Sequence, residues 1–250
     1  TVTIVAKFAI LQTIMLIIGH RGAAGLAREN TLEALCAGVN AGADILEFDV
    51  RLTKDNIPVV VHDWHIFRTH KSAAIVSSLT LEQLDEKTGD EPIVTLAAVL
   101  DEFFGNILLN IELKGRGTAK VVGELLKNNY IKRDDDWDNI IVSSFLGSEL
   151  RVMRRMSDKA NLSLLHNQNP FLFIAYHRSI HLTAVGFHRL YTNRLALEIA
   201  SKTGLFMYAY TVDRPDSARR LAQLGIGGIV TNRPDILRRS MAEMADSPDD

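Results

Sequence analysis

Apolar runs of strand length alternate with amphipathic stretches of helix length along most of the chain. Buried parallel strands produce such runs, and apolar residues three or four positions apart produce helices that pack on them. The expected strands are Ile14–Ile18, Asp44–Arg51, Asn106–Leu113, Asn139–Ser144, Asn161–His166, His181–Phe187, Leu205–Thr211 and Gly227–Thr231. The expected helices are Thr31–Ala41, Thr95–Phe104, Thr118–Asn128, Ser148–Ser157, Phe171–Arg178, Thr192–Lys202, Arg214–Leu224 and Pro234–Ala245. This strict alternation predicts an α/β fold, a TIM-type (β/α)8 barrel.

One further apolar run, Ile57–His62, follows the second expected strand after too few residues for a crossover helix, which a parallel return would require. We therefore expect it to return antiparallel, as a β-hairpin after strand 2. Asp55 and Asn56 both tolerate turn geometry, and a two-residue turn there would place His62 opposite Asp49.

The length and composition favour a single barrel domain over residues 1–250, with 64–92 as a small insertion or lid before helix 2. The formal net charge is −2, which gives no basic surface of the kind that binds nucleic acid. Cys36 is the only cysteine, so no intrachain disulfide can form. Its apolar neighbours predict that it lies on the buried side of a helix.

The N-terminal segment is mostly apolar but carries Lys7 and several polar residues. A membrane span needs about 20 apolar residues, and a signal peptide needs a basic start and a small-residue cleavage site. Because neither pattern is clean, we expect Val2–Ile10 to plug the barrel or add a strand. We expect a cytoplasmic protein, with peripheral membrane association as the lesser alternative, and the oligomeric state stays open.

Acidic residues gather at the C-terminal ends of the expected strands, where barrel enzymes carry their catalytic groups. Glu47 and Asp49 are two positions apart on one strand and therefore face the same side, and Glu112 lies on the next barrel strand. Carboxylates that point together repel, and a divalent cation removes that conflict. Oxygen ligands suit Mg²⁺ or Ca²⁺ better than Zn²⁺. Ordinary ion pairs with nearby arginines and lysines are the alternative interpretation.

Two histidines and two cations follow the same strand ends and add the remaining parts of phosphodiester chemistry. His20 and His62 suit a base for the nucleophile and an acid for the leaving oxygen. Arg21 offers planar donors that match phosphate, and Lys114 offers a point charge. Tyr210, at the end of the seventh expected strand, is a further candidate for binding the phosphate or the substrate.

Short motifs follow one another in a fixed order along almost the whole chain. They are His20–Gly22, Glu29–Thr31, Glu47–Val50, Thr53–Asp55, Pro58–Asp63, Leu79–Leu84, Ile111–Lys114, Val142–Phe145, Tyr210–Asp213 and Gly225–Asp235. This ordered set resembles the glycerophosphodiester phosphodiesterase family. The resemblance implies that Mg²⁺ or Ca²⁺ binds Glu47, Asp49 and Glu112. It also implies that His20 and His62 act as acid and base, and that the products are sn-glycerol 3-phosphate and an alcohol.

The chain departs from the family pattern at a few positions that bear on headgroup preference rather than on the chemistry. Arg28 stands where the family often has Pro, Tyr210 where Trp is common, and Asp213 where Asn is common. Asn30 is expected to be a helix N-cap, with Glu33 three residues later completing a capping box.

The leading hypothesis is metal-dependent hydrolysis of a small-molecule glycerophosphodiester. A phospholipase acting on lysolipids is the nearest alternative, with a lipid rim formed by Trp64, Phe67, Phe103 and Phe104. A metal-dependent isomerase or aldolase is less favoured, because cations beside the acids suit phosphate better than a sugar carbonyl. A non-catalytic binding barrel would not need both histidines and all three acids. The nucleophile, either water or the glycerol 2-hydroxyl, stays open.

Overall fold

Eight parallel strands close into a barrel in the computed structural model, which describes residues 15–166 and 168–245. β9 and β2 both pair with β1, which closes the ring. The barrel strands are β1 (Leu16–Gly19), β2 (Ile45–Leu52), β4 (Leu108–Leu113), β5 (Ile140–Ser144), β6 (Asn161–His166), β7 (Ala184–His188), β8 (Phe206–Tyr210) and β9 (Gly228–Thr231). The predicted (β/α)8 barrel is therefore confirmed. The extra strand or plug expected at Val2–Ile10 lies outside the described residues.

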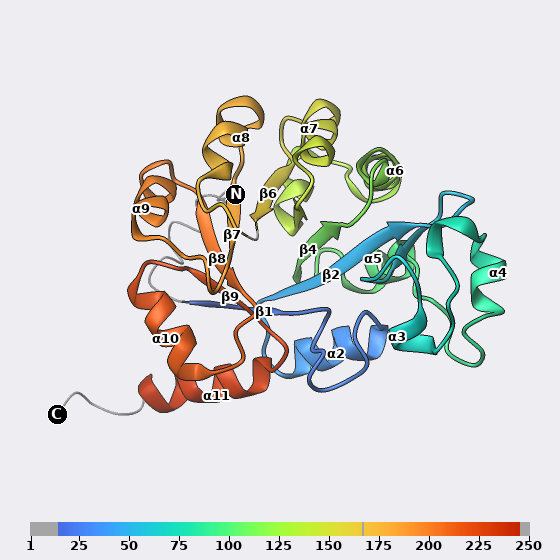
Figure 1. The fold of residues 1–250 in the computed structure, drawn as a ribbon, viewed down its shortest axis with the longest axis horizontal. Helices are drawn as coiled ribbons and strands as arrows, with labels where there is room; N and C mark the ends of the chain where they lie inside the picture. Colours follow the sequence, from blue (N-terminus) through green and yellow to red (C-terminus); the bar gives the residue numbers. More distant parts are fainter. Residues whose placement is uncertain (1–14, 167, 246–250) are drawn as a thin grey trace.

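A helix follows each barrel strand and packs on the outside of the barrel (Figure 1). These helices are α2 (Leu32–Asn40), α5 (Leu96–Phe103), α6 (Thr118–Leu125), α7 (Gly147–Met156), α8 (Leu172–Ile180), α9 (Arg194–Lys202), α10 (Pro215–Gln223) and α11 (Pro234–Ala245). A π-helical turn, η3 (Leu126–Tyr130), continues α6, and a 3₁₀ helix, η4 (Asp134–Asn139), precedes β5. Buried apolar side chains from the outer faces of the strands and the inner faces of the helices form the main hydrophobic core.

The inside of the barrel holds a second, smaller apolar cluster that includes Ile18, Ile45, Phe206 and Val230. Side chains alternate between the two faces of a strand, so the residues two and four positions after Ile45 on β2 also point inward. Those residues are acidic and lie nearer the C-terminal end of the strand. The apolar cluster therefore closes the barrel beneath the acids and leaves them at its mouth.

The expected hairpin is present, with β3 (Pro58–Val60) antiparallel to β2, but its predicted register was wrong by one residue. Val50 pairs with Val60, and Val61 donates its backbone N–H to the Asp49 carbonyl oxygen at 2.9 Å. The reason is a three-residue turn in place of the two-residue turn, with Asn56 in the left-handed region at φ +61°. Asp49 therefore lies opposite Val61 rather than His62.

The insertion after the hairpin contains α3 (Phe67–His70), η2 (Val76–Ser78) and α4 (Leu81–Asp85). It has a small core of its own, which includes Ile66 and Leu84 and packs against β3. Figure 1 shows that β2 reaches out of the barrel toward these helices. Trp64 and Phe67 are 58% and 57% exposed, but Phe103 is 5% exposed and packs in the main core. Phe103 therefore cannot belong to the lipid rim considered above.

One smaller expectation about a helix was wrong. Cys36 was expected on the buried side of its helix, but it is exposed, because Ala34, Leu35 and Gly38 form the buried face of α2. Among the described residues, no helix combines the length and the apolar character that crossing a membrane requires.

Candidate active site

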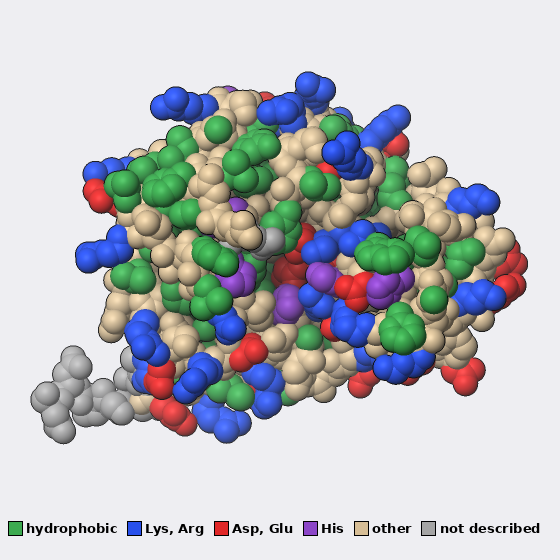
Figure 2. All heavy atoms as spheres, in the orientation of Figure 1, with side chains coloured by type: hydrophobic (Ala, Val, Ile, Leu, Met, Phe, Trp, Pro, Cys, Tyr) green, Lys and Arg blue, Asp and Glu red, His purple; other side chains and the backbone are tan. Residues whose placement is uncertain are grey.

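Three buried carboxylates meet at the C-terminal mouth of the barrel. Glu47 and Asp49 come from β2 and Glu112 comes from β4, where it pairs in register with Asp49. Each offers a carboxylate oxygen within 4.8 Å of the other two. Glu47 and Glu112 line a cavity of about 180 Å³. Figure 2 shows acidic atoms at the floor of a hollow, bordered by histidine and basic side chains. The sequence-predicted acids are thus brought together.

The negative charges of the three carboxylates are only partly balanced by the cationic side chains beside them. Burial and the neighbouring acids raise the pKa of Glu47 well above its ordinary value, and the same causes raise the pKa of Glu112 to about 7. Burial would also raise the pKa of Asp49, but Lys114 and Arg21 hold it below its ordinary value. Lys114 Nζ lies 2.6 Å from Glu112 Oε1 and 3.4 Å from Asp49 Oδ1.

These contacts make the cluster a fitting site for a hard divalent cation. Two cationic side chains do not suffice to keep all three carboxyls ionised, as the raised pKa values of Glu47 and Glu112 indicate. The donor atoms are all carboxylate oxygens, which Mg²⁺ and Ca²⁺ prefer. The alternative of simple ion pairs leaves Glu47 without a cationic side chain within 4.0 Å in the described part of the chain.

Arg21 lies beside the acids and is held by several contacts. Its backbone adopts a positive φ of +50°, and its N–H donates to Glu47 Oε2 at 2.9 Å. Its guanidinium donates to Glu29 Oε1 at 2.6 Å and lies 3.3 Å from Asp49 Oδ2. Glu29 in turn accepts two hydrogen bonds from Arg68 of α3, at 2.5 and 2.7 Å. The insertion therefore helps to orient Arg21 at the barrel mouth.

The interpretation of Asn30 as a helix N-cap was wrong. Thr31 caps α2, because its side chain accepts from the Ala34 N–H at 3.1 Å. Asn30 instead has a positive φ of +59°, and its amide makes two hydrogen bonds to Asp49, one to the carboxylate at 2.9 Å and one from the backbone N–H at 3.2 Å. Asn30 therefore fixes the orientation of Asp49.

His20, just after β1, belongs to a chain of polar groups that the sequence did not predict. Its Nδ1 lies 2.7 Å from Asn232 Oδ1, and Asn232 Nδ2 donates to Asp213 Oδ2 at 2.9 Å. Asp213 also accepts from the Asn232 backbone N–H at 2.8 Å and from the Thr231 hydroxyl at 2.9 Å. Burial and the charge of Arg21 lower the pKa of His20. His20 is therefore neutral near pH 7.

His62 reaches the same cavity from the end of the hairpin. Its Nδ1 lies 2.7 Å from Asp63 Oδ1, and its backbone carbonyl accepts from Arg51 Nε at 2.8 Å. Arg68 donates to the second oxygen of Asp63 at 2.8 Å. Burial lowers the pKa of His62, and Lys114 and Arg21 lower it further, whereas Asp49 and Asp63 oppose this shift.

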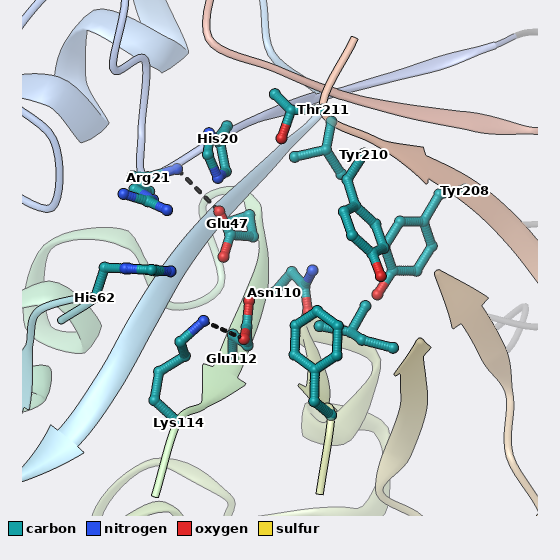
Figure 3. A pocket seen from close by; sticks show the side chains of 13 residues that line it. His20, Arg21, Glu47, His62, Asn110, Glu112, Lys114, Tyr208, Tyr210 and Thr211 are labelled. Carbon is teal, nitrogen blue, oxygen red and sulfur yellow. Dashed lines mark hydrogen bonds and ion pairs between the residues drawn. The ribbon is translucent and has the colours of Figure 1, made fainter. Parts of the chain in front are cut away.

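The opposite wall of the cavity is aromatic. Figure 3 shows Tyr208 and Tyr210 facing the histidines and cations across the acids. The Tyr210 hydroxyl donates to the His166 carbonyl at 2.6 Å, which occupies its single donor proton. Tyr210 therefore presents its ring to a substrate, and its role in phosphate binding stays a prediction. Phe145, from the loop after β5, stands edge-on to this ring with centroids 6.0 Å apart.

A (β/α)8 barrel that gathers carboxylates, histidines and cations at its mouth defines a class of enzymes that act on phosphate esters with a bound metal. Residues 20–236 match the glycerophosphoryl diester phosphodiesterase family. The chain belongs to this family and is an enzyme of the phosphodiesterase class.

Similar proteins cover nearly the whole chain. The glycerophosphodiester phosphodiesterase of Caldanaerobacter subterraneus subsp. tengcongensis is 33% identical, over 89% of this chain and 96% of that protein. The crystal structure of the Thermotoga maritima glycerophosphodiester phosphodiesterase is similar with a TM-score of 0.77 and 26% identity, covering 90% and 98% of the two chains. The Oleispira antarctica phosphodiesterase in complex with the product sn-glycerol-3-phosphate shares the fold with a TM-score of 0.80 and 22% identity, covering 93% and 99%.

Proposed function

We propose that this enzyme hydrolyses glycerophosphodiesters to sn-glycerol 3-phosphate and an alcohol, with a divalent cation on Glu47, Asp49 and Glu112. The observation that carries the proposal is the buried triad of acids, with carboxylate oxygens within 4.8 Å of one another, flanked by two histidines. Family membership and the product named for the Oleispira antarctica structure support the same substrate class.

A Mg²⁺ or Ca²⁺ ion on the triad would neutralise charge on the non-bridging phosphoryl oxygens and fix the diester in the cavity. Arg21 and Lys114 add donors on the same side, and both line the cavity. Because each of them is already held by a carboxylate, its position is set before the substrate arrives.

The hydrogen-bond chain of His20 supports a role for it as the base. Asp213 is a carboxylate and can only accept, so the amide nitrogen of Asn232 must point toward it and the amide oxygen toward His20. That oxygen accepts the Nδ1–H of a neutral imidazole, which leaves the lone pair on Nε2. Nε2 is therefore free to take the proton of the nucleophile, either water or the glycerol 2-hydroxyl.

His62 carries a different partner and suits the acid role. Its Nδ1 faces the Asp63 carboxylate rather than an amide, and that negative charge favours the protonated ring against the burial that lowers its pKa. The proton on Nε2 would then pass to the leaving alkoxide oxygen. In-line displacement places attacking and leaving oxygens on opposite sides of phosphorus, which two histidines on different loops can serve at once.

Substrates with different leaving groups test this division of roles. On glycerophosphocholine with saturating Mg²⁺ or Ca²⁺, His20→Ala and His62→Ala should each lower turnover by about 10²- to 10⁴-fold. A nitrophenyl ester of glycerol phosphate needs little protonation of its leaving group, so it should restore most of the turnover of His62→Ala but not of His20→Ala. Full activity of both variants on the natural diester would refute the two-histidine mechanism. If the nitrophenyl ester instead restored the turnover of His20→Ala, the acid and base roles of the two histidines would be reversed.

A further inference from the structure

A second cavity, of about 240 Å³, opens beside the active site between the insertion and the loop after β4. Arg51, Trp64 and Arg116 give it its chemical character. Arg51 donates to the His62 carbonyl, and Trp64 follows His62 by two residues. Arg116 likewise follows Lys114 of the first cavity by two residues. We call this space the Arg51–Arg116 cavity.

Neither arginine of this cavity pairs directly with a carboxylate in the described part of the chain, although the charges of Asp49, Asp63 and Glu112 act on Arg51 from farther away. Arg51 is half-buried and makes one hydrogen bond, to a carbonyl, with no carboxylate within 4.0 Å. Arg116 is exposed and likewise forms no ion pair among the described residues. Arg21, Arg68 and Lys114 differ, because each lies within 4.0 Å of two carboxylates. Two guanidinium groups therefore remain available to a ligand.

The position of the cavity matches the leaving side of the proposed reaction. His62 gives its proton to the leaving oxygen, so the alcohol departs on the side of His62, next to Arg51. In Figure 3, His62 and Lys114 lie on the side of the acids away from Tyr208 and Tyr210.

We propose that the Arg51–Arg116 cavity binds the leaving alcohol and selects alcohols that carry an anionic group, either a carboxylate or a phosphate. Guanidinium forks match both anions, and the exposed indole of Trp64 offers a flat face against which the headgroup packs. The inference rests on the proposed function, because it uses His62 as the acid on the leaving oxygen.

Two substrates that differ by one carboxylate test the inference. Glycerophosphoserine and glycerophosphoethanolamine share every other group, and the readout is the ratio of their kcat/KM values at low ionic strength. The expected wild-type ratio is about 10 in favour of serine, and 0.5 M NaCl should lower it. The second arm of the experiment compares the kcat/KM values of glycerophosphoinositol 4-phosphate and glycerophosphoinositol. It distinguishes a preference for phosphate from a preference for carboxylate.

Arg116→Gln should reduce the preference for the anionic member of the favoured pair by about threefold, and the double variant with Arg51→Gln should abolish it. If Arg51→Gln instead disturbed His62, the kcat/KM values of both substrates in a pair would fall equally, and their ratio would not change. Arg189→Gln, an exposed arginine after β7, is the matched control and should keep the wild-type ratio. A wild-type ratio near 1 in both arms, or ratios that the Arg51 and Arg116 substitutions leave unchanged, would refute the subsite alone. Failure to hydrolyse any of the four diesters would refute the proposed function as well.

A direct binding measurement complements the kinetics. Trp64 is exposed in the cavity and the other tryptophan, Trp137, is buried, so fluorescence quenching reports on the cavity. In the His20→Ala variant, glycerophosphoserine should quench at about tenfold lower concentration than glycerophosphoethanolamine. The signal should vanish when Trp64→Phe is added. Equal quenching by both diesters would argue against an anion-selective cavity.

Discussion

Replacing Asn232 with Ala should slow the enzyme by disturbing the protonation of His20 without touching the ring itself. On the proposed assignment the Asp213 carboxylate fixes the amide, and the amide oxygen, 2.7 Å from Nδ1, holds the proton on that nitrogen. Without Asn232 the imidazole is free to carry its proton on Nε2 instead. In that tautomer it cannot accept a proton from the nucleophile.

The size of the effect follows from the burial of this hydrogen bond. A buried donor that loses its partner costs about 1–3 kcal/mol, which corresponds to roughly 5- to 150-fold in rate. Asp213→Asn should have a smaller effect of the same sign, since Asn232 keeps its place but loses its fixed orientation. His20→Ala, which removes the proposed base altogether, sets the upper limit at about 10²- to 10⁴-fold.

The assay combines turnover with a direct view of the tautomer. Turnover of glycerophosphocholine is measured at saturating metal, and long-range ¹H–¹⁵N spectra of histidine-labelled protein report which nitrogen of His20 carries the proton, with His20→Ala for assignment. Asn106→Ala, at an exposed asparagine outside the site, is the control. A wild-type His20 protonated on Nε2, or full turnover of Asn232→Ala, would refute the reasoning.

Three further predictions concern the metal, pH and the fold. Glu112→Gln should weaken divalent-metal affinity at least about tenfold in calorimetric titration and should lower activity in parallel. Unchanged activity of the native enzyme in a strong chelator would contradict the metal site. Burial lowers the pKa of His166 from its ordinary value of 6.5 to about 4, so unfolding takes up a proton between these two pH values. Stability should therefore fall by up to about 1.4 kcal/mol per unit as pH drops through this window, and His166→Gln should flatten that slope in denaturant titrations. The buried Glu149 carboxylate accepts from two backbone N–H groups at the start of α6. Glu149→Ala should therefore lower the free energy of unfolding by about 2 kcal/mol in calorimetry. The control, Glu124→Ala at an exposed position, should change it by nearly zero.

The barrel and its acids could be predicted because they depend on local rules. Strand alternation decides that Glu47 and Asp49 point the same way, and the parallel order of β2 and β4 places Glu112 beside them. The hairpin was also predictable, since its short connection rules out a crossover. Its register was not, because one additional residue in the turn shifts every pair along the two strands.

The polar groups that orient the site escaped prediction because their contacts are distant in sequence. His20 and Asn232 are 212 positions apart and meet only when β9 closes against β1. Asn30 was misassigned because asparagine favours both helix caps and left-handed turns, and only the folded position of Asp49 decides between them. The unusual Asp213 was the one visible signal, since it departs from the family pattern at the position that fixes Asn232.

Arg68 binds Glu29 and Asp63 at once, from a helix of four residues in the insertion. Through Glu29 it reaches Arg21, and through Asp63 it reaches His62. A transient opening of this small segment would release both sides of the mouth together, even while the barrel stays folded. The fraction of molecules competent for turnover is therefore tied to the local unfolding equilibrium of the insertion. Slower hydrogen exchange of its amides should accompany higher activity among variants of its core.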